Sequence, residues 1–264
     1  MSEKSLLQYV DRNPVTIPDR DNDKFAILLS DSQGKCLQNL HRNSKIPIQF
    51  LCTPGARTQS AFDKLKLEIE KLIREHQKPV VVYAWLGTCD ITEKISRKEG
   101  WIDIRYSTEG KATRKLIEQY QELKDFVFSK QGTIKFITLP TYSTVIYNKN
   151  KKHKKPEKFE SSDSKILREL NELNGRIIEL NKSLGRNTLQ FHLDLRKNRS
   201  GRKPDLPSRK SIHWHLLKDG LHPKRALAKK WLRRLEIDIV SECWTDPEIV
   251  SLEVDPQEAQ SAGL

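Results

Sequence analysis

The chain has 264 residues, of which 36% are hydrophobic and 31% are charged, and its net charge is +13. This length fits one large domain with insertions or two small ones, and no run of about 18 apolar residues is present that could cross a membrane. The four cysteines form no Cys-x-x-Cys pair and lack finger-like spacing, which argues against a structural zinc site and a disulfide framework.

The positive charge is concentrated in the body of the chain. Residues 241–264 hold six carboxylates and no Lys or Arg, which leaves +19 on residues 1–240. We expect an N-terminal extension at 1–22, a basic domain at 23–240 and an acidic C-terminal tail at 241–264. Residues 1–21 lack the basic-then-apolar pattern of a signal peptide, so we expect an intracellular protein, cytoplasmic or nuclear and not secreted.

In the first half of the chain, short apolar runs alternate with amphipathic stretches. This alternation predicts buried strands at 25–29, 46–51 and 79–86, with helices at 34–41 and from Ser60 onward. The run at 79–86 is rich in β-branched and aromatic residues and stops at Gly87, so we expect it to lie at the centre of a sheet. Pro47 favours the start or the edge of the second strand.

The second half of the chain is more polar but repeats the same order. Residues 91–110 are predicted to form a loop or insertion, and helical spacing of apolar residues predicts helices at 112–129 and 164–184. Further strands are predicted at 133–139 and 188–193. The last helix is expected to bury Leu227, Trp231 and Leu235 and to present its Lys and Arg side chains outward.

This strand-then-helix order predicts an α/β fold. We expect a doubly wound, mainly parallel, five-stranded sheet with helices on both faces, a flavodoxin-like three-layer sandwich. In such sheets, ligands bind beyond the carboxyl ends of the strands. Ser32, Gly55 and Cys89 follow the first, second and third strands, so the topology brings all three to one edge.

Four short fragments carry the candidate chemistry. They are Ser30-Asp-Ser-Gln-Gly34, Pro54-Gly-Ala56, Gly87-Thr-Cys-Asp90 and Asp219-Gly-Leu-His222. Together they supply a hydroxyl nucleophile, an oxyanion pocket, and a general base with an orienting carboxylate. Each fragment also has a plain structural interpretation, because a serine after a strand is usually a helix cap and His-Pro often starts a helix.

From about residue 24 to residue 236 the chain resembles the SGNH hydrolases, also called the GDSL esterase and lipase family. The resemblance implies that Ser32 is the nucleophile, that Asp219 and His222 complete a catalytic triad, and that Ser32, Gly55 and Cys89 form the oxyanion hole. The third fragment departs from the family pattern Gly-x-Asn-Asp, since Cys89 stands where the family has Asn. An S–H group is a much weaker donor than an amide NH₂.

Two functions of different class follow. The first is a serine esterase that cleaves a small acyl ester, for example an acetyl ester, without a cofactor and with a weakened oxyanion hole. The second is a catalytically inactive SGNH-like module that binds nucleic acid or a protein partner. The segments 85–92, 217–224 and 228–233 also resemble SGNH-like proteins encoded by invertebrate retroelements, which would place the protein near element RNA or DNA.

Two further features leave alternatives open. Cys89 is either an inert buried thiol or a reactive thiolate near His222. His213 and His215 could share a face on a strand, but two imidazoles alone do not make a metal site, and packing of Trp214 near the active edge is the alternative. The sequence therefore predicts no metal site.

Basic residues outside the four fragments suggest nonspecific binding of RNA or DNA. They occupy basic insertions at about 148–160 and 196–212 and the last helix, and the candidate polyanion-binding residues are Lys149, Lys151, Lys152, Lys154, Lys155, Arg199, Arg202, Lys229, Lys230 and Arg233. The tract 149–155, a loop before Pro156, could equally be a nuclear import signal, a phosphate clamp or a solvated loop. Phosphate contacts by these residues would weaken steeply with salt.

Overall fold

A computed structural model describes residues 1–42, 44–197 and 209–245. Its main sheet is parallel and has four strands in the order β2-β1-β3-β6. The strands are β1 (Phe25–Ser30), β2 (Ile48–Cys52), β3 (Val80–Trp85) and β6 (Thr133–Phe136). The predicted α/β fold with a mainly parallel sheet is confirmed. β3 lies inside the sheet, as expected, and β2, which begins directly after Pro47, lies at an edge.

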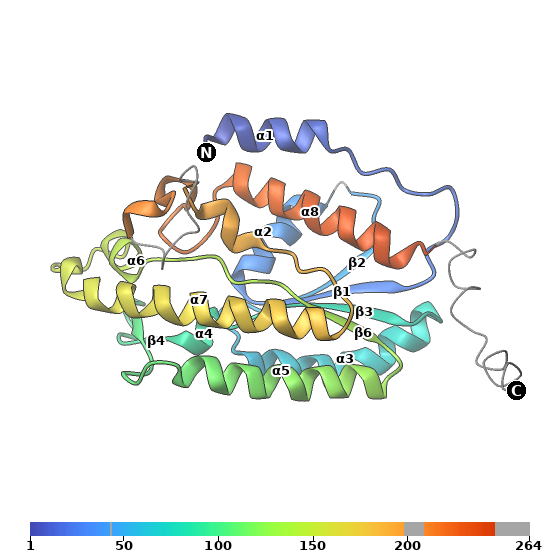
Figure 1. Ribbon diagram of the computed structural model, residues 1–264, viewed down its shortest axis with the longest axis horizontal. Helices are drawn as coiled ribbons and strands as arrows, with labels where there is room; N and C mark the ends of the chain where they lie inside the picture. The colour runs from blue at the N-terminus through green and yellow to red at the C-terminus, as the bar shows by residue number, and fades with distance from the viewer. Residues whose placement is uncertain (43, 198–208, 246–264) are drawn as a thin grey trace, which may run out of the picture.

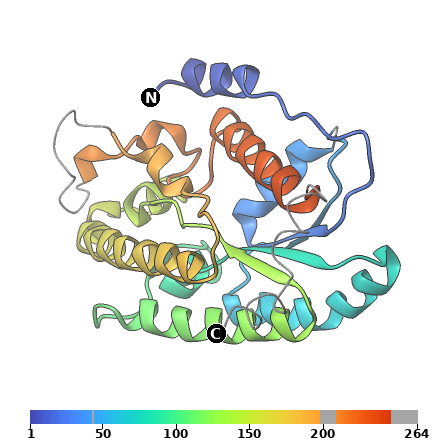
Figure 2. The ribbon, with the colours of Figure 1, turned by 45° about the vertical axis from the view of Figure 1, so that its right-hand side comes forward.

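Helices cover both faces of this sheet (Figure 1). One face carries α2 (Ser32–His41) and α8 (Arg225–Cys243), and the other carries α3 (Thr58–His76), α5 (Lys111–Ser129) and α7 (Glu160–Ser183). Figure 2 shows α1 (Glu3–Arg12) outside α8, as the outermost helix on its side. None of the described helices combines the length and the apolar character that a membrane crossing requires.

Alternate residues of each strand enter two separate cores. Ile27, Leu29 and Val82 pack among α3, α5 and α7, whereas Leu28 and Tyr83 pack among α2, α8 and Leu6 of α1. Strands buried on both sides read as continuous apolar runs, which is why the sequence located β1 and β3 well.

Residues 91–110, predicted as a loop or insertion, contain short regular elements. α4 (Thr88–Ile91) leads into an antiparallel pair, β4 (Thr92–Lys94) and β5 (Ile102–Ile104). After β6 the chain forms α6 (Thr144–Asn150) and a short 3-10 turn, η1 (Pro156–Phe159), before α7. The tract 149–155 is therefore not entirely a loop, since α6 includes Lys149.

The predicted fifth strand at 188–193 is wrong. Leu189 O accepts hydrogen bonds from the N–H and hydroxyl of Thr138, and the chain then turns into η2 (Phe191–Leu195) rather than extending along β6. The turn stacks Phe191 on Trp231, with ring centroids 5.3 Å apart, and brings the Asp194 carboxylate to the indole N–H of Trp231. Aromatic packing and a buried carboxylate therefore outweigh strand pairing at this position. A last 3-10 turn, η4 (Trp214–Leu216), precedes the loop that leads to α8.

Candidate active site

The sharp turn after β1 places Ser32 at the first position of α2. Asp31 caps this helix, and its Oδ1 accepts a hydrogen bond of 2.8 Å from the Gln33 amide. Gly34 allows the helix to approach the strands closely, because a Cβ at this position would lie 2.4 Å from Ser30 Cβ and 2.8 Å from Cys52 Sγ. The Ser32 hydroxyl therefore lies at the carboxyl edge of the sheet. At this point the strand order reverses, because the chain after β1 continues to β2 on one side and the chain after β3 continues to β6 on the other.

Ser32, His222 and Asp219 form a continuous chain of hydrogen bonds. His222 Nε2 lies 2.9 Å from Ser32 Oγ, and His222 Nδ1 lies 2.8 Å from Asp219 Oδ2. The other oxygen, Asp219 Oδ1, accepts the backbone N–H groups of Leu221 and His222 at 3.1 and 2.8 Å. The structure thus brings together the hydroxyl, imidazole and carboxylate that the sequence suggested.

The loop that carries the imidazole is held from both sides. Gly220 adopts a positive φ of 86°, and a Cβ there would lie 2.7 Å from Ile146 Cβ of α6. Its carbonyl accepts a hydrogen bond from the Ser143 amide, and the Lys218 amide donates to the carbonyl of His222. α8 begins three residues after His222, so the core under α8 fixes the position of the ring.

The two aspartates next to this chain have opposite electrostatics. Burial raises the pKa of Asp219, but hydrogen bonds from the side chain and backbone of His222 outweigh it and bring the pKa down to about 2. Burial raises the pKa of Asp31 to about 6, against the hydrogen bond from Gln33. Asp219 is therefore a permanent anion that can stabilise an imidazolium, whereas Asp31 changes charge near neutral pH.

The oxyanion side is built from two loops that brace each other. Gly55 is exposed at a positive φ of 78°, and Gly87 has a φ of 124° at the end of β3. The backbone N–H and hydroxyl of Thr58 both donate to Asp90 Oδ2, at 3.0 and 2.9 Å, which ties the Gly55 loop to the Cys89 loop. Gln33 Nε2 donates to Thr88 Oγ1 at 3.2 Å, which ties α2 to the same place.

Cys89 is half-buried in this frame. Burial, together with the negative charges of Asp31 and Asp90, raises the pKa of its thiol to about 12. The thiol therefore stays protonated at neutral pH, which argues against the reactive-thiolate alternative and leaves a weak S–H donor.

Two residues near the site carried no signal in the sequence. Arg105, from the 91–110 segment, donates to the carbonyls of Cys89, Asp90 and Thr92 and so clamps the loop of the third fragment. Tyr147 of α6 is half-buried, and burial, followed by the charges of Asp219 and Cys89, raises the pKa of its hydroxyl. Only tertiary contacts reveal either residue.

The candidate polyanion-binding residues that the structure describes come from two segments, the end of α6 with the chain after it, and α8. Lys149, Lys151, Lys152, Lys154 and Lys155 are exposed at and after the end of α6, while Arg199 and Arg202 lie outside the described residues. The expectation that the cations of the last helix point outward is wrong for Lys230, whose side chain is only 12% exposed. Its Nζ binds Asp194 and lies over the ring of Tyr9, because α1 packs on the outer side of α8.

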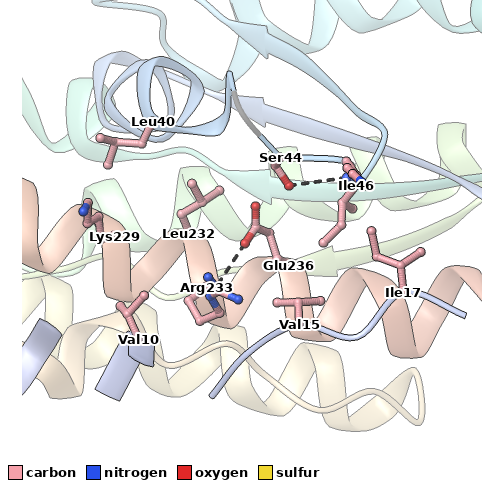
Figure 3. Close-up of a pocket in the computed structure, with 11 residues that line it drawn as sticks. Val10, Val15, Ile17, Leu40, Ser44, Ile46, Lys229, Leu232, Arg233 and Glu236 are labelled. Carbon is pink, nitrogen blue, oxygen red and sulfur yellow. Dashed lines mark hydrogen bonds and ion pairs between the residues drawn. The ribbon is translucent and has the colours of Figure 1, made fainter. Parts of the chain in front are cut away.

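Lys229 and Arg233 line a separate cavity of about 390 Å³ (Figure 3). Its apolar wall comes from α2, α8 and the segment after α1, and the Glu236 carboxylate lies 3.9 Å from Arg233 Nε. Ser32, Asp219 and His222 do not line this cavity.

The histidine pair at 213 and 215 flanks Trp214 at the start of η4. The two rings are 5.4 Å apart between centroids. Within the described ranges, no group of three His, Cys, Asp or Glu side chains has the spacing of a metal site.

No protein-family model and no curated protein matches the chain. Solved structures do match it, though at low sequence identity. A protein from Bacteroides fragilis described as a candidate acylhydrolase is 12% identical with a TM-score of 0.57, over 92% of this chain and 98% of that one. A GDSL-like lipase from Bacteroides thetaiotaomicron is 11% identical with a TM-score of 0.54, over 91% and 99%. A member of the lipolytic G-D-S-L family from Veillonella parvula is 10% identical with a TM-score of 0.51, over 81% and 97%. The topology, the helical layers and these matches agree: the chain has the fold of the GDSL and SGNH lipases and acylhydrolases.

Proposed function

We propose that the protein is a serine hydrolase of the SGNH type that cleaves a small acyl ester. The observation that carries the proposal is the unbroken hydrogen-bonded chain from Ser32 Oγ through the His222 imidazole to the Asp219 carboxylate. A nucleophile, a base and an orienting group within hydrogen-bond reach are what acyl transfer requires. The shared fold of lipases and acylhydrolases supports the same class of reaction.

In the proposed reaction, His222 Nε2 takes the proton of Ser32 Oγ as that oxygen attacks the ester carbonyl carbon. The negative charge that develops on the carbonyl oxygen meets the backbone N–H groups of Ser32 and Gly55, with the Cys89 S–H as a weak third donor. The alcohol leaves with the proton from His222, which gives an acyl-serine. Water, deprotonated by the same imidazole, then attacks the acyl group and releases the carboxylic acid.

The decisive experiment compares Ser32→Ala with the wild-type protein on a short-chain aryl ester such as 4-nitrophenyl acetate. We expect the variant to lose about 10³-fold or more in kcat, because it has no nucleophile. Ser129→Ala, at the exposed C-terminal end of α5 and so at the opposite end of the sheet, is the matched control and should keep the full rate. Equal rates for Ser32→Ala and wild type would refute the proposal and leave the inactive binding module.

A further inference from the structure

A second, smaller cavity of about 220 Å³ lies next to the oxyanion loops. Arg57, which lines it, comes two residues after Gly55, and Asp90, also in its lining, comes directly after Cys89. Because consecutive Cα atoms are about 3.8 Å apart, these lining residues, and with them the cavity, lie close to the candidate oxyanion hole. Lys115 and Gln119 of α5 also line it.

The lining of this cavity is cationic. Arg57, Arg105 and Lys115 face a single carboxylate, Asp90. That carboxylate offsets one of the three cations, and Glu93, 3.3 Å from Arg105 Nη1, offsets a second. One positive charge is left over, and Arg57 and Lys115 are the cations without an ion-pair partner among the described residues.

The cations differ in what they can still bind. Arg105 already donates to three backbone carbonyls and to Glu93. Arg57 and Lys115 are exposed, and within the described part of the chain neither has a carboxylate within ion-pair distance. These two side chains therefore have N–H groups available for a ligand, and Gln119 adds a neutral amide beside them, whereas Gln59 Nε2 already donates to Asp63 Oδ1 at 3.0 Å.

Other cations around the site extend this positive field. Lys94 of β4 is exposed and near enough for its charge to act on Cys89, and exposed Lys218 directly precedes Asp219. Fields of one sign around a cleft raise the local concentration of oppositely charged ligands. Because the Asp219 carboxylate belongs to the Ser32–His222 chain, an anionic group would be drawn to the cations of the cavity beside Ser32 rather than to the hydroxyl itself.

We propose that the cavity of Arg57, Arg105 and Lys115 binds a negatively charged group of the ester substrate, so that the enzyme acts on anionic esters. This inference rests on the proposed function. The cavity is smaller than the roughly 300–1,000 Å³ of ordinary ligand pockets, so it holds one charged group, a carboxylate, sulfonate or phosphate, rather than the whole substrate. That group is attached either to the acyl part or to the alcohol part of the ester.

Three esters separate these cases. 4-Nitrophenyl acetate is neutral, 4-nitrophenyl hemisuccinate carries its charge on the acyl part, and 4-acetoxybenzenesulfonate carries it on the alcohol part. We expect Arg57→Gln to lower kcat/KM about fivefold to tenfold for one of the charged esters and less than about twofold for the neutral ester. Lys115→Gln should likewise lower kcat/KM for the same charged ester more than for the neutral ester. Raising NaCl from about 20 to about 200 mM should lower kcat/KM for the same charged ester only.

Arg74→Gln is the matched control, because Arg74 is an exposed cation on α3, the helix that Arg57 precedes, roughly 25 Å along its axis at about 1.5 Å per residue. It should leave all three rates unchanged. If Arg57→Gln and Lys115→Gln affect the three esters equally, or none of them, the cavity does not select charge and the proposal is overturned.

A binding measurement keeps this test independent of turnover. Calorimetry with the Ser32→Ala variant should show tighter binding of the selected charged ester than of 4-nitrophenyl acetate, and adding Arg57→Gln should remove the difference. Equal affinities would overturn the charged subsite. Undiminished hydrolysis by Ser32→Ala would instead refute the esterase proposal, so the two failures are distinct.

Discussion

The two halves of the candidate site are held together in different ways. On the proton-transfer side, Asp219 and His222 are three residues apart, and their side chains and backbone bond directly to one another. On the proposed oxyanion side, Gly55 and Cys89 come from separate loops that Thr58 and Asp90 join, and Arg105 holds the Cys89 loop. The first half is held by the residues of the proposed proton transfer themselves, and the second is held by neighbouring residues that take no part in the proposed reaction.

This difference indicates which positions of the site can be substituted without changing its structure. Replacing a member of the Ser32, His222 and Asp219 chain breaks a hydrogen bond of the proposed mechanism. Replacing the side chain at Cys89 leaves the loop in place, because Arg105 holds its backbone carbonyls and not its side chain. The oxyanion side can therefore lose donor strength without losing its shape.

The largest effect is expected on the proton-transfer side, from Asp219→Asn. An asparagine would still hold the ring but would favour the wrong tautomer and remove the charge that stabilises imidazolium. We expect kcat for a short-chain aryl ester to fall about 10⁴-fold while the fold is kept. Asp125→Asn, at an exposed position of α5, is the control. A loss below tenfold would mean that the carboxylate plays no such part.

On the oxyanion side, Cys89→Asn is expected to increase activity. An amide NH₂ would replace a thiol whose pKa of about 12 keeps it a weak neutral donor. One oxyanion donor is worth about 10²–10³ in rate elsewhere, so we expect kcat to rise about 10²-fold. Cys36→Asn, one turn beyond Ser32 on α2, should produce no such gain. An unchanged rate in Cys89→Asn would show that this position does not face the oxyanion.

Arg105→Gln tests whether the oxyanion side depends on its supports. Losing the clamp on three carbonyls should lower kcat about tenfold with little change in KM for a neutral ester, because the loop would hold its donors less well. The sharper readout is the double variant: the gain from Cys89→Asn should largely disappear when Arg105 is also replaced. Full additivity of the two changes would contradict a positioning role for Arg105.

The smallest effect is expected on the free energy of unfolding, from a substitution of Asp31, which lies between the two halves. The folded pKa of Asp31, about 6, is above its ordinary value of 3.8, so ionisation costs stability; the cost is absent below pH 3.8 and complete above pH 6. Asp31→Asn keeps a good helix cap and removes this cost. We expect it to raise the free energy of unfolding by about 1–3 kcal/mol at about pH 8 and to change it little at about pH 4.

Urea unfolding at both pH values measures this difference. A gain that is the same at low and high pH would mean that the stabilisation arises from something other than the charge of Asp31. The neighbouring Ser32 hydroxyl can be followed in the same variant by its rate on the aryl ester, which separates a change in stability from a change in chemistry.

The sequence predicted what depends on local pattern. Apolar runs located β1 and β3, and the ends of these strands led to Ser32 and the Cys89 loop. It failed where tertiary packing decides: the stack of Phe191 on Trp231 replaced a predicted fifth strand, and the packing of α1 against α8 covered Lys230. Arg105 lies in a polar stretch with no periodicity, so its contacts with the third fragment could not be foreseen.

Ser32 and His222 are 190 positions apart in the chain. Protein synthesis proceeds from the N-terminus, so Ser32 is made before His222, and α8 follows both. While the intervening residues are being added, the nascent chain carries the serine without its imidazole partner. The proposed proton transfer to His222 therefore requires that α8 has been made and has packed on the sheet.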